Sequence, residues 1–94
     1  MKCEVALTEK VKVQLEELSD YLEAKFGKKA ANRLYSEFMA AIQIISNFPE
    51  ICPIIDGQGT RKCVLRKKSV VFYEVQGNVV TVFAIRDGRQ DWKP

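Results

Sequence analysis

Residues 8–47 decide the fold, and they read TEKVKVQLEELSDYLEAKFGKKAANRLYSEFMAAIQIISN. On each side of Gly27, apolar residues recur every three or four positions, which is the spacing of an amphipathic helix. The first apolar stripe consists of Val11, Leu15, Leu18, Leu22 and Phe26, and the second of Ala31, Leu34, Phe38, Ala41, Ile42 and Ile45. The stretch therefore predicts two amphipathic helices, over residues 9–26 and 28–47.

Local signals mark the ends of both helices. The Thr8 hydroxyl suits an N-cap, because it can accept a hydrogen bond from an unpaired amide of the first turn. Gly27 is typical of the position just beyond a helix, and Phe48-Pro49 ends the second helix. Because the connection at Gly27 is short, the helices should lie antiparallel, with both apolar stripes facing one sheet.

Four segments have the character of strands. Apolar and polar side chains alternate over residues 2–7, as in a strand with one face buried. Three later runs are rich in β-branched and aromatic residues, namely 61–66, 70–75 and 79–85. The turn Gln76-Gly77-Asn78 is typical of a hairpin, so these runs should be antiparallel neighbours. The order strand, two helices, three strands predicts an α+β fold, with a single domain over residues 1–94.

Composition excludes several classes of function. The chain has no histidine, which excludes Ser-His-Asp and Cys-His catalysis and disfavours a zinc site, so we expect no metal and no cofactor. No stretch approaches the roughly 20 apolar residues of a membrane span, and the first residues lack the apolar core of a signal peptide. We therefore expect a cytoplasmic protein with no membrane contact.

Two expectations concern the segment between the helices and the later strands. Residues 49–60 are rich in Pro, Gly and Asp and predict an ordered loop, in which Ile51, Ile54 and Ile55 should be buried. The three cysteines form an odd set without metal-ligand spacing, and we interpret them as buried thiols in a reducing compartment. They are Cys3, Cys52 and Cys63.

Positive charge is concentrated in the second half of the chain. Residues 1–50 carry seven basic and eight acidic side chains, whereas residues 51–94 carry eight basic and four acidic ones. Five cations fall within eight residues without one acid: Arg61, Lys62, Arg66, Lys67 and Lys68. The run fits an edge strand protected from pairing with other sheets, and it fits a surface that contacts phosphate groups. Charge alone does not choose between the two.

The tail after the last strand favours a binding surface. It reads RDGRQDW from Arg86 to Trp92, directly after an apolar strand. Side chains on loops and tails of a rigid sheet often form sites. Trp92 suits an interface anchor, although packing onto the end of the sheet fits it equally well.

The ordered set of motifs resembles the RelE/ParE family of toxins from bacterial type II toxin-antitoxin systems, once described as plasmid stabilisation proteins. The motifs are Asn47-Phe48-Pro49, Leu65-Arg66, Phe72-Tyr73-Glu74-Val75 and Ile85-Arg86-Asp87-Gly88-Arg89-Gln90-Asp91. The resemblance implies a helical hairpin on one face of a twisted antiparallel sheet. It also implies a cognate antitoxin that wraps the toxin in a hetero-oligomer.

The resemblance implies two different targets, DNA gyrase for ParE-like members and messenger RNA on the ribosome for RelE-like members. Lys62 and Arg66 match cations near the substrate phosphate in RelE-like toxins, and Arg89 or Gln90 stands at a later arginine. Val64 and Val70 replace two further cations of that pattern. Arg66 and Arg89 are therefore the catalytic candidates only if the chain is a nuclease.

We interpret the chain as a toxin that inhibits growth by binding DNA gyrase. The binding candidates, for this target or for nucleic acid, are Lys62, Arg66, Lys67, Arg86, Arg89 and Trp92. Two alternatives stay open: a ribosome-dependent endoribonuclease, which would be an enzyme, and a degenerate member that only binds nucleic acid or antitoxin. Cleavage through a ribose 2′-OH needs a proton acceptor, and no acid is spaced so as to stand out among Glu74, Asp87 and Asp91.

Overall fold

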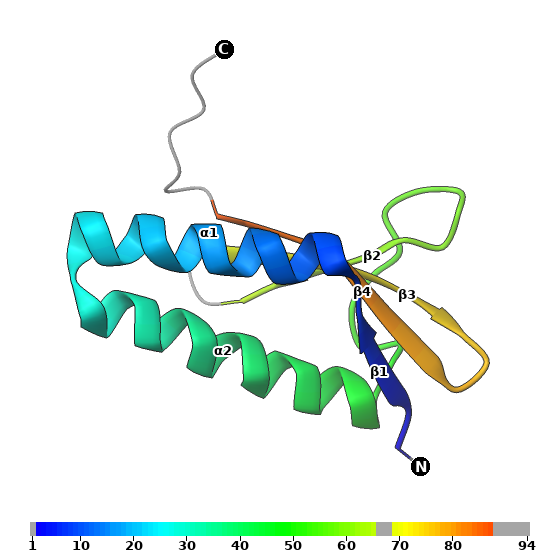
Figure 1. The fold of residues 1–94 in the computed structure, drawn as a ribbon. Coiled ribbons are helices and arrows are strands. Elements are labelled where there is room, and N and C mark those ends of the chain that lie inside the picture. The colour runs from blue at the N-terminus through cyan, green and yellow to red at the C-terminus, as the bar shows by residue number, and fades with distance from the viewer. Residues whose placement is uncertain (1, 66–68, 88–94) are drawn as a thin grey trace.

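A computed structural model describes residues 2–65 and 69–87 of the chain (Figure 1). Strand β1 (Glu4–Leu7) leads into helix α1 (Glu9–Phe26), and helix α2 (Lys28–Asn47) follows at once. Strands β2 (Arg61–Val64), β3 (Ser69–Gln76) and β4 (Val79–Asp87) complete the order. The predicted α+β fold and its sequence of elements are therefore confirmed.

The two helices form the predicted antiparallel hairpin, side by side on one face of the sheet (Figure 1). The Thr8 hydroxyl caps α1 by accepting a hydrogen bond from the Val11 amide at 3.1 Å. Gly27 adopts a φ of 98°, a conformation that L side chains rarely adopt, and its amide donates to the Glu23 carbonyl. One glycine thus ends α1 and begins α2.

The sheet has the order β1-β4-β3-β2. Strands β2, β3 and β4 are antiparallel neighbours, as predicted, whereas β1 pairs in parallel with β4, so the sheet is mixed rather than wholly antiparallel. The reason lies in the connection, because the helices and two further strands separate β1 from β4 and bring the chain back in the direction of β1. A direct hairpin between β1 and β4 would have made the two strands antiparallel.

The core lies between the helical hairpin and the inner face of the sheet. Its largest fully buried side chains include Tyr73, Phe38, Leu18, Leu22, Leu34 and Ile45. A register shift opposite Phe72 and Tyr73 leaves Phe83 as an extra residue in β4. Next to this bulge the Ile85 amide donates to the Gln14 side chain of α1 at 3.0 Å, so the helix satisfies a backbone group near the irregularity.

Several predicted core positions are in fact exposed. Phe26 lies at the outer end of α1, and Ile51, Ile54 and Ile55 of the 48–60 loop are 49–55% exposed. The burial expected for these three isoleucines is therefore wrong. The loop runs along the edge of the sheet, where the described part of the chain forms no second layer over it, and polar contacts hold it there instead. Within the described residues, no helix is both long enough and apolar enough to cross a membrane.

Candidate functional site

Two of the predicted binding residues lie in the described structure, and they share one face of the sheet. Lys62 on β2 and Arg86 on β4 are both exposed, and they alternate with buried neighbours that point toward the helices. The other four candidates, Arg66, Lys67, Arg89 and Trp92, lie outside the described residues. We call the sheet face opposite the helices, which carries Lys62 and Arg86, the outer face.

Strand register arranges the outer face in two rows. Lys62 stands opposite Phe72, which stands opposite Ala84. In the next row, Arg86 stands opposite Val70, which stands opposite Val64. Directly opposite residues share a face, and ordinary strand spacing puts the Cα atoms of Lys62 and Arg86 about 12 Å apart.

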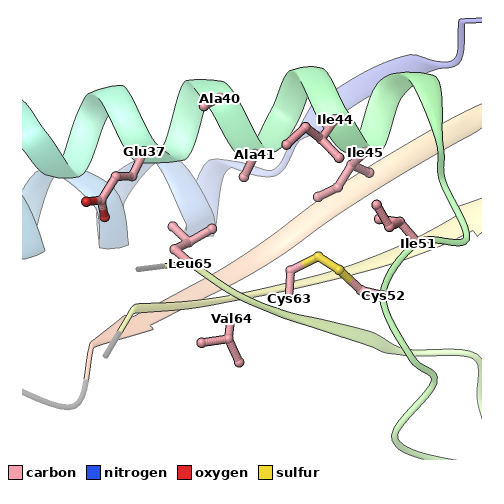
Figure 2. A pocket seen from close by; sticks show the side chains of 10 residues that line it. All are labelled: Glu37, Ala40, Ala41, Ile44, Ile45, Ile51, Cys52, Cys63, Val64 and Leu65. Atoms are coloured by element: carbon pink, nitrogen blue, oxygen red, sulfur yellow. A yellow bond between two sulfur atoms is a disulfide. The ribbon is translucent and has the colours of Figure 1, made fainter. Parts of the chain in front are cut away.

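The centre of the outer face is apolar. Val64 is 62% exposed, Val70 and Phe72 are half-buried, and Figure 2 shows Val64 pointing away from α2. Two cations therefore flank an apolar strip. Such a surface combines apolar contact area with charge and suits a macromolecular partner.

The acids of the described structure do not form a catalytic set with these cations. Glu74 lies on the outer face opposite Thr81 and is the diagonal neighbour of Lys62. It stands one row beyond Phe72 and two rows from Arg86. Asp87 is only 1% exposed and lies on the inner side. Asp91 lies outside the described residues. The described residues therefore bring together cations and apolar groups, without a proton acceptor between them.

Asp87 takes part in a buried hydrogen bond at the end of the β3–β4 pair. The Ser69 hydroxyl donates to Oδ2 of Asp87 at 2.6 Å, and both side chains are almost fully buried. Burial of a carboxylate is costly unless hydrogen bonds compensate it. Ser69 therefore stabilises the end of β4, from which the Arg86 side chain projects on the opposite face.

Replacing Ser69 by alanine is expected to lower the free energy of unfolding by about 1.5–3 kcal/mol, the range for a hydrogen bond to a charged group. The matched control is Ser46→Ala, because the buried Ser46 hydroxyl donates to the neutral carbonyl of Cys3 at 3.0 Å. That loss should be about 0.5–1.5 kcal/mol. Urea unfolding measures both values, and equal losses would show that the Asp87 carboxyl draws no extra stabilisation from Ser69.

A second candidate site, which the sequence did not indicate, is an apolar groove between α2 and β2 with a volume of about 430 Å³ (Figure 2). It exists because α1 packs closely on β4, whereas α2 packs on α1 and lightly on β1 without extensive contact to β2 among the described residues. Its lining residues are Glu37, Ala40, Ala41, Ile44, Ile45, Ile51, Cys52, Cys63, Val64 and Leu65. Glu37 is the one charged side chain among them.

A disulfide between Cys52 and Cys63 forms part of the groove wall, with a Cα–Cα distance of 5.4 Å. The prediction of three thiols is therefore wrong for this pair, and only Cys3, which is half-buried, is a free thiol. The antiparallel bridge between Ile54 and Arg61 folds the loop back on β2 and brings the two cysteines together. Their 11-residue separation alone did not reveal this pairing.

Polar contacts fasten the loop to the sheet. The Tyr73 hydroxyl donates to the Pro49 carbonyl at 2.8 Å, the Arg61 guanidinium donates to the Cys52 carbonyl, and the Lys62 amide donates to the Pro53 carbonyl. Burial is the largest influence on the Tyr73 hydroxyl and raises its pKa above the ordinary value of 10.0. At the loop tip, backbone hydrogen bonds led by that of Thr60 lower the pKa of Asp56. The loop is thus an ordered wall of the groove.

No group of acidic or cysteine side chains in the described residues has an arrangement that could hold a metal ion. The site therefore consists of two surfaces on opposite sides of β2. One is the outer face with its two cations, and the other is the apolar groove with the disulfide.

Comparison with known proteins gives a consistent family match. The model of the ParE toxin of the type II toxin-antitoxin system parDE matches residues 5–92. No curated protein matches the chain significantly.

Solved structures with the same fold have little sequence identity to this chain. A chain of the chromosomal ParDE toxin-antitoxin system from P. aeruginosa superposes with a TM-score of 0.78 at 15% identity, covering 92% of this chain and 96% of its own. A chain of the RelBE2 toxin-antitoxin complex from Mycobacterium tuberculosis gives 0.70 at 14% identity, covering 93% and 99%. A conserved hypothetical protein from Helicobacter pylori gives 0.61 at 12% identity, covering 92% and 94%.

Proposed function

Because the chain belongs to the ParE toxin family of type II toxin-antitoxin systems, we propose that it inhibits growth by binding DNA gyrase and that a cognate antitoxin neutralises it. The observation that carries the choice of target is the composition of the outer face. Lys62 and Arg86 flank exposed Val64 and half-buried Phe72, and among the described residues no acid lies between these two cations. This arrangement supports binding of a macromolecule more than cleavage of a phosphodiester, which needs a proton acceptor.

The groove supports the antitoxin half of the proposal. Ile44 and Ile51 expose apolar surface along it, and Arg61 stands beside it on β2. An antitoxin segment with apolar anchors and acidic flanks would match both properties. The two similar structures are named for a ParDE toxin-antitoxin system and a RelBE2 toxin-antitoxin complex.

Induced expression followed by two parallel measurements tests the target. We expect growth inhibition, inhibition of supercoiling by purified gyrase, and intact messenger RNA by primer extension. Cuts at defined codon positions with normal supercoiling would replace the proposal with a ribosome-dependent endoribonuclease. Absence of growth inhibition by the folded protein would identify a chain that only binds its partner.

The double variant Lys62→Ala/Arg86→Ala is expected to weaken gyrase inhibition at least tenfold, because it removes both described cations from the outer face. The control Lys10→Ala/Lys29→Ala removes the same charge from exposed helix positions on the other side of the sheet and should change inhibition less than twofold. Inhibition curves against gyrase concentration measure both. Equal effects of the two double variants would mean that net charge matters and the outer face does not.

A further inference from the structure

We propose that Cys52 and Cys63 form a reversible redox site, reduced by small thiols of the dithiol or glutathione class, whose state determines whether the 48–60 loop is held against β2. The inference goes beyond the proposed target and antitoxin. The tests use neither gyrase nor antitoxin. The redox proposal can therefore fail while the proposed function stands, and the proposed function can fail while the redox proposal stands.

The disulfide lies where a small thiol can reach it. Both cysteines line the groove of about 430 Å³, which has room for a small molecule beside the sulfur atoms. Cys52 is half-buried and Cys63 is only 7% exposed, so we take the sulfur of the more exposed residue, Cys52, as the point of attack. Structural disulfides in a protein core lack such an approach.

The disulfide is also the one covalent attachment of a loop that packing holds poorly. Ile51, Ile54 and Ile55 are each about half exposed, so burial contributes little to holding the loop. Hydrogen bonds to the carbonyls of Pro49, Glu50, Cys52 and Pro53 also attach the loop. Individual hydrogen bonds of this kind contribute little net stability. Breaking the disulfide should therefore loosen the groove wall selectively.

The redox step balances with a dithiol reductant. A thiolate of the reductant attacks Sγ of Cys52, the bond between the two protein sulfurs breaks, and Cys63 leaves as a thiolate that takes up a proton. The second thiol of the reductant then displaces Cys52 and closes the cyclic disulfide of the reductant. Two electrons and two protons pass to the protein, and the reductant is oxidised.

The surroundings of the pair support reversibility. The Arg61 guanidinium, which is bound to the Cys52 carbonyl, places positive charge near a thiolate that forms there and favours it. Figure 2 shows Glu37, the one charged side chain that lines the groove, at the opposite end from the disulfide, so its negative charge lies away from the sulfur atoms. After reduction, the two thiols stay linked through the chain at a sequence separation of 11 residues, so re-oxidation remains an intramolecular step.

The first test places the full chain in anaerobic mixtures of reduced and oxidised dithiothreitol, then in glutathione mixtures, and alkylates free thiols after an acid quench and denaturation. We expect Cys52 and Cys63 to become alkylated together in one two-electron transition. Cys3 is the internal control and should be alkylated in every mixture. Full alkylation of the pair under oxidising conditions, or resistance to excess dithiothreitol until the protein is unfolded, would overturn the proposal.

The second test compares amide hydrogen exchange of the wild-type protein in its oxidised and reduced states. The Lys62 amide, bonded to Pro53, and the Ile55 amide, bonded to Thr60, should exchange at least tenfold faster after reduction. The Ile85 and Val11 amides, bonded to Gln14 and Thr8, should change less than twofold. Unchanged exchange at Lys62 and Ile55 would show that the disulfide does not control the loop.

Replacing Cys3 tests whether the redox transition belongs to Cys52 and Cys63 alone. Cys3→Ser should show the same alkylation transition as the wild type, because Cys3 contributes only a half-buried thiol beside the end of α2. Loss of the transition in Cys3→Ser would mean that Cys3 takes part in the exchange, and the site as proposed would be incorrect.

Discussion

Replacing Ile44 by aspartate is expected to weaken binding of the cognate antitoxin at least a hundredfold while the protein stays folded. Ile44 lines the groove on α2 and is 49% exposed, so the variant carboxylate remains hydrated in the free protein. An apolar segment seated in the groove would remove that water without offering a partner for the charge. A hundredfold loss corresponds to about 2.7 kcal/mol of binding free energy.

Val13→Asp is the matched control for Ile44→Asp. Val13 is 50% exposed on α1, is likewise β-branched and helical, and does not line the groove. Both variants should change the free energy of unfolding by only about 0.5 kcal/mol, as exposed substitutions usually do. Titration calorimetry with the cognate antitoxin measures the affinity. A change below threefold for Ile44→Asp, or equal losses for both variants, would place the antitoxin elsewhere.

Tyr73→Ala is expected to lower the free energy of unfolding by about 3–5 kcal/mol, a large part of the stability of a domain of this size. Tyr73 is the largest of the fully buried side chains and lies in the core cluster between the helices and the sheet. Removing its ring leaves a cavity within this core cluster. The ring alone accounts for most of the expected loss.

Tyr73→Phe separates the hydroxyl from the ring. It keeps the ring and loses only the hydrogen bond to the Pro49 carbonyl, so it should cost about 0.5–1.5 kcal/mol. Amide exchange near residues 50–55 should increase in Tyr73→Phe, because the hydroxyl fastens the start of the loop. Urea unfolding with exchange measurements tests both variants. Equal losses of unfolding free energy in Tyr73→Ala and Tyr73→Phe would mean that the packing of the ring does not account for most of the effect.

The pKa of Tyr73 gives the direction of a pH effect. Burial raises this pKa above 10.0, so the folded state disfavours the phenolate that the unfolded chain forms readily. The stability that Tyr73 contributes is therefore fully present below pH 10 and decreases as the pH rises through the folded-state pKa.

Sequence patterns were sufficient for the secondary structure of this chain. Thr8 and Gly27 mark helix ends by local hydrogen bonding and backbone geometry, which do not depend on distant residues. Alternating burial in β3 and in the first part of β4 likewise follows from side-chain period, so the faces of these segments were predictable. The outer-face position of Lys62 follows from the same alternation. That of Arg86 depends on the bulge at Phe83, which shifts the alternation in the second part of β4.

The sequence alone did not show which strand β1 pairs with, or whether the pair is parallel or antiparallel. The pattern of residues 2–7 shows that one face is buried, yet the same pattern fits a parallel or an antiparallel neighbour. The path of the intervening chain decides between them, and it brings Glu4 opposite Val79 in a parallel pair. Likewise, Ile51, Ile54 and Ile55 are apolar by sequence but lie on an edge that nothing in the described chain covers.

By itself, the sequence determined the elements, their order, the helix ends and the positive charge of the second half, because each depends on neighbours within a few positions. The tertiary structure alone decided the mixed sheet, the groove and the Cys52–Cys63 disulfide. These features depend on how far α2 stands from β2 and on how the 48–60 loop folds back. Such distances are the outcome of packing between segments far apart in the chain, which no local pattern encodes.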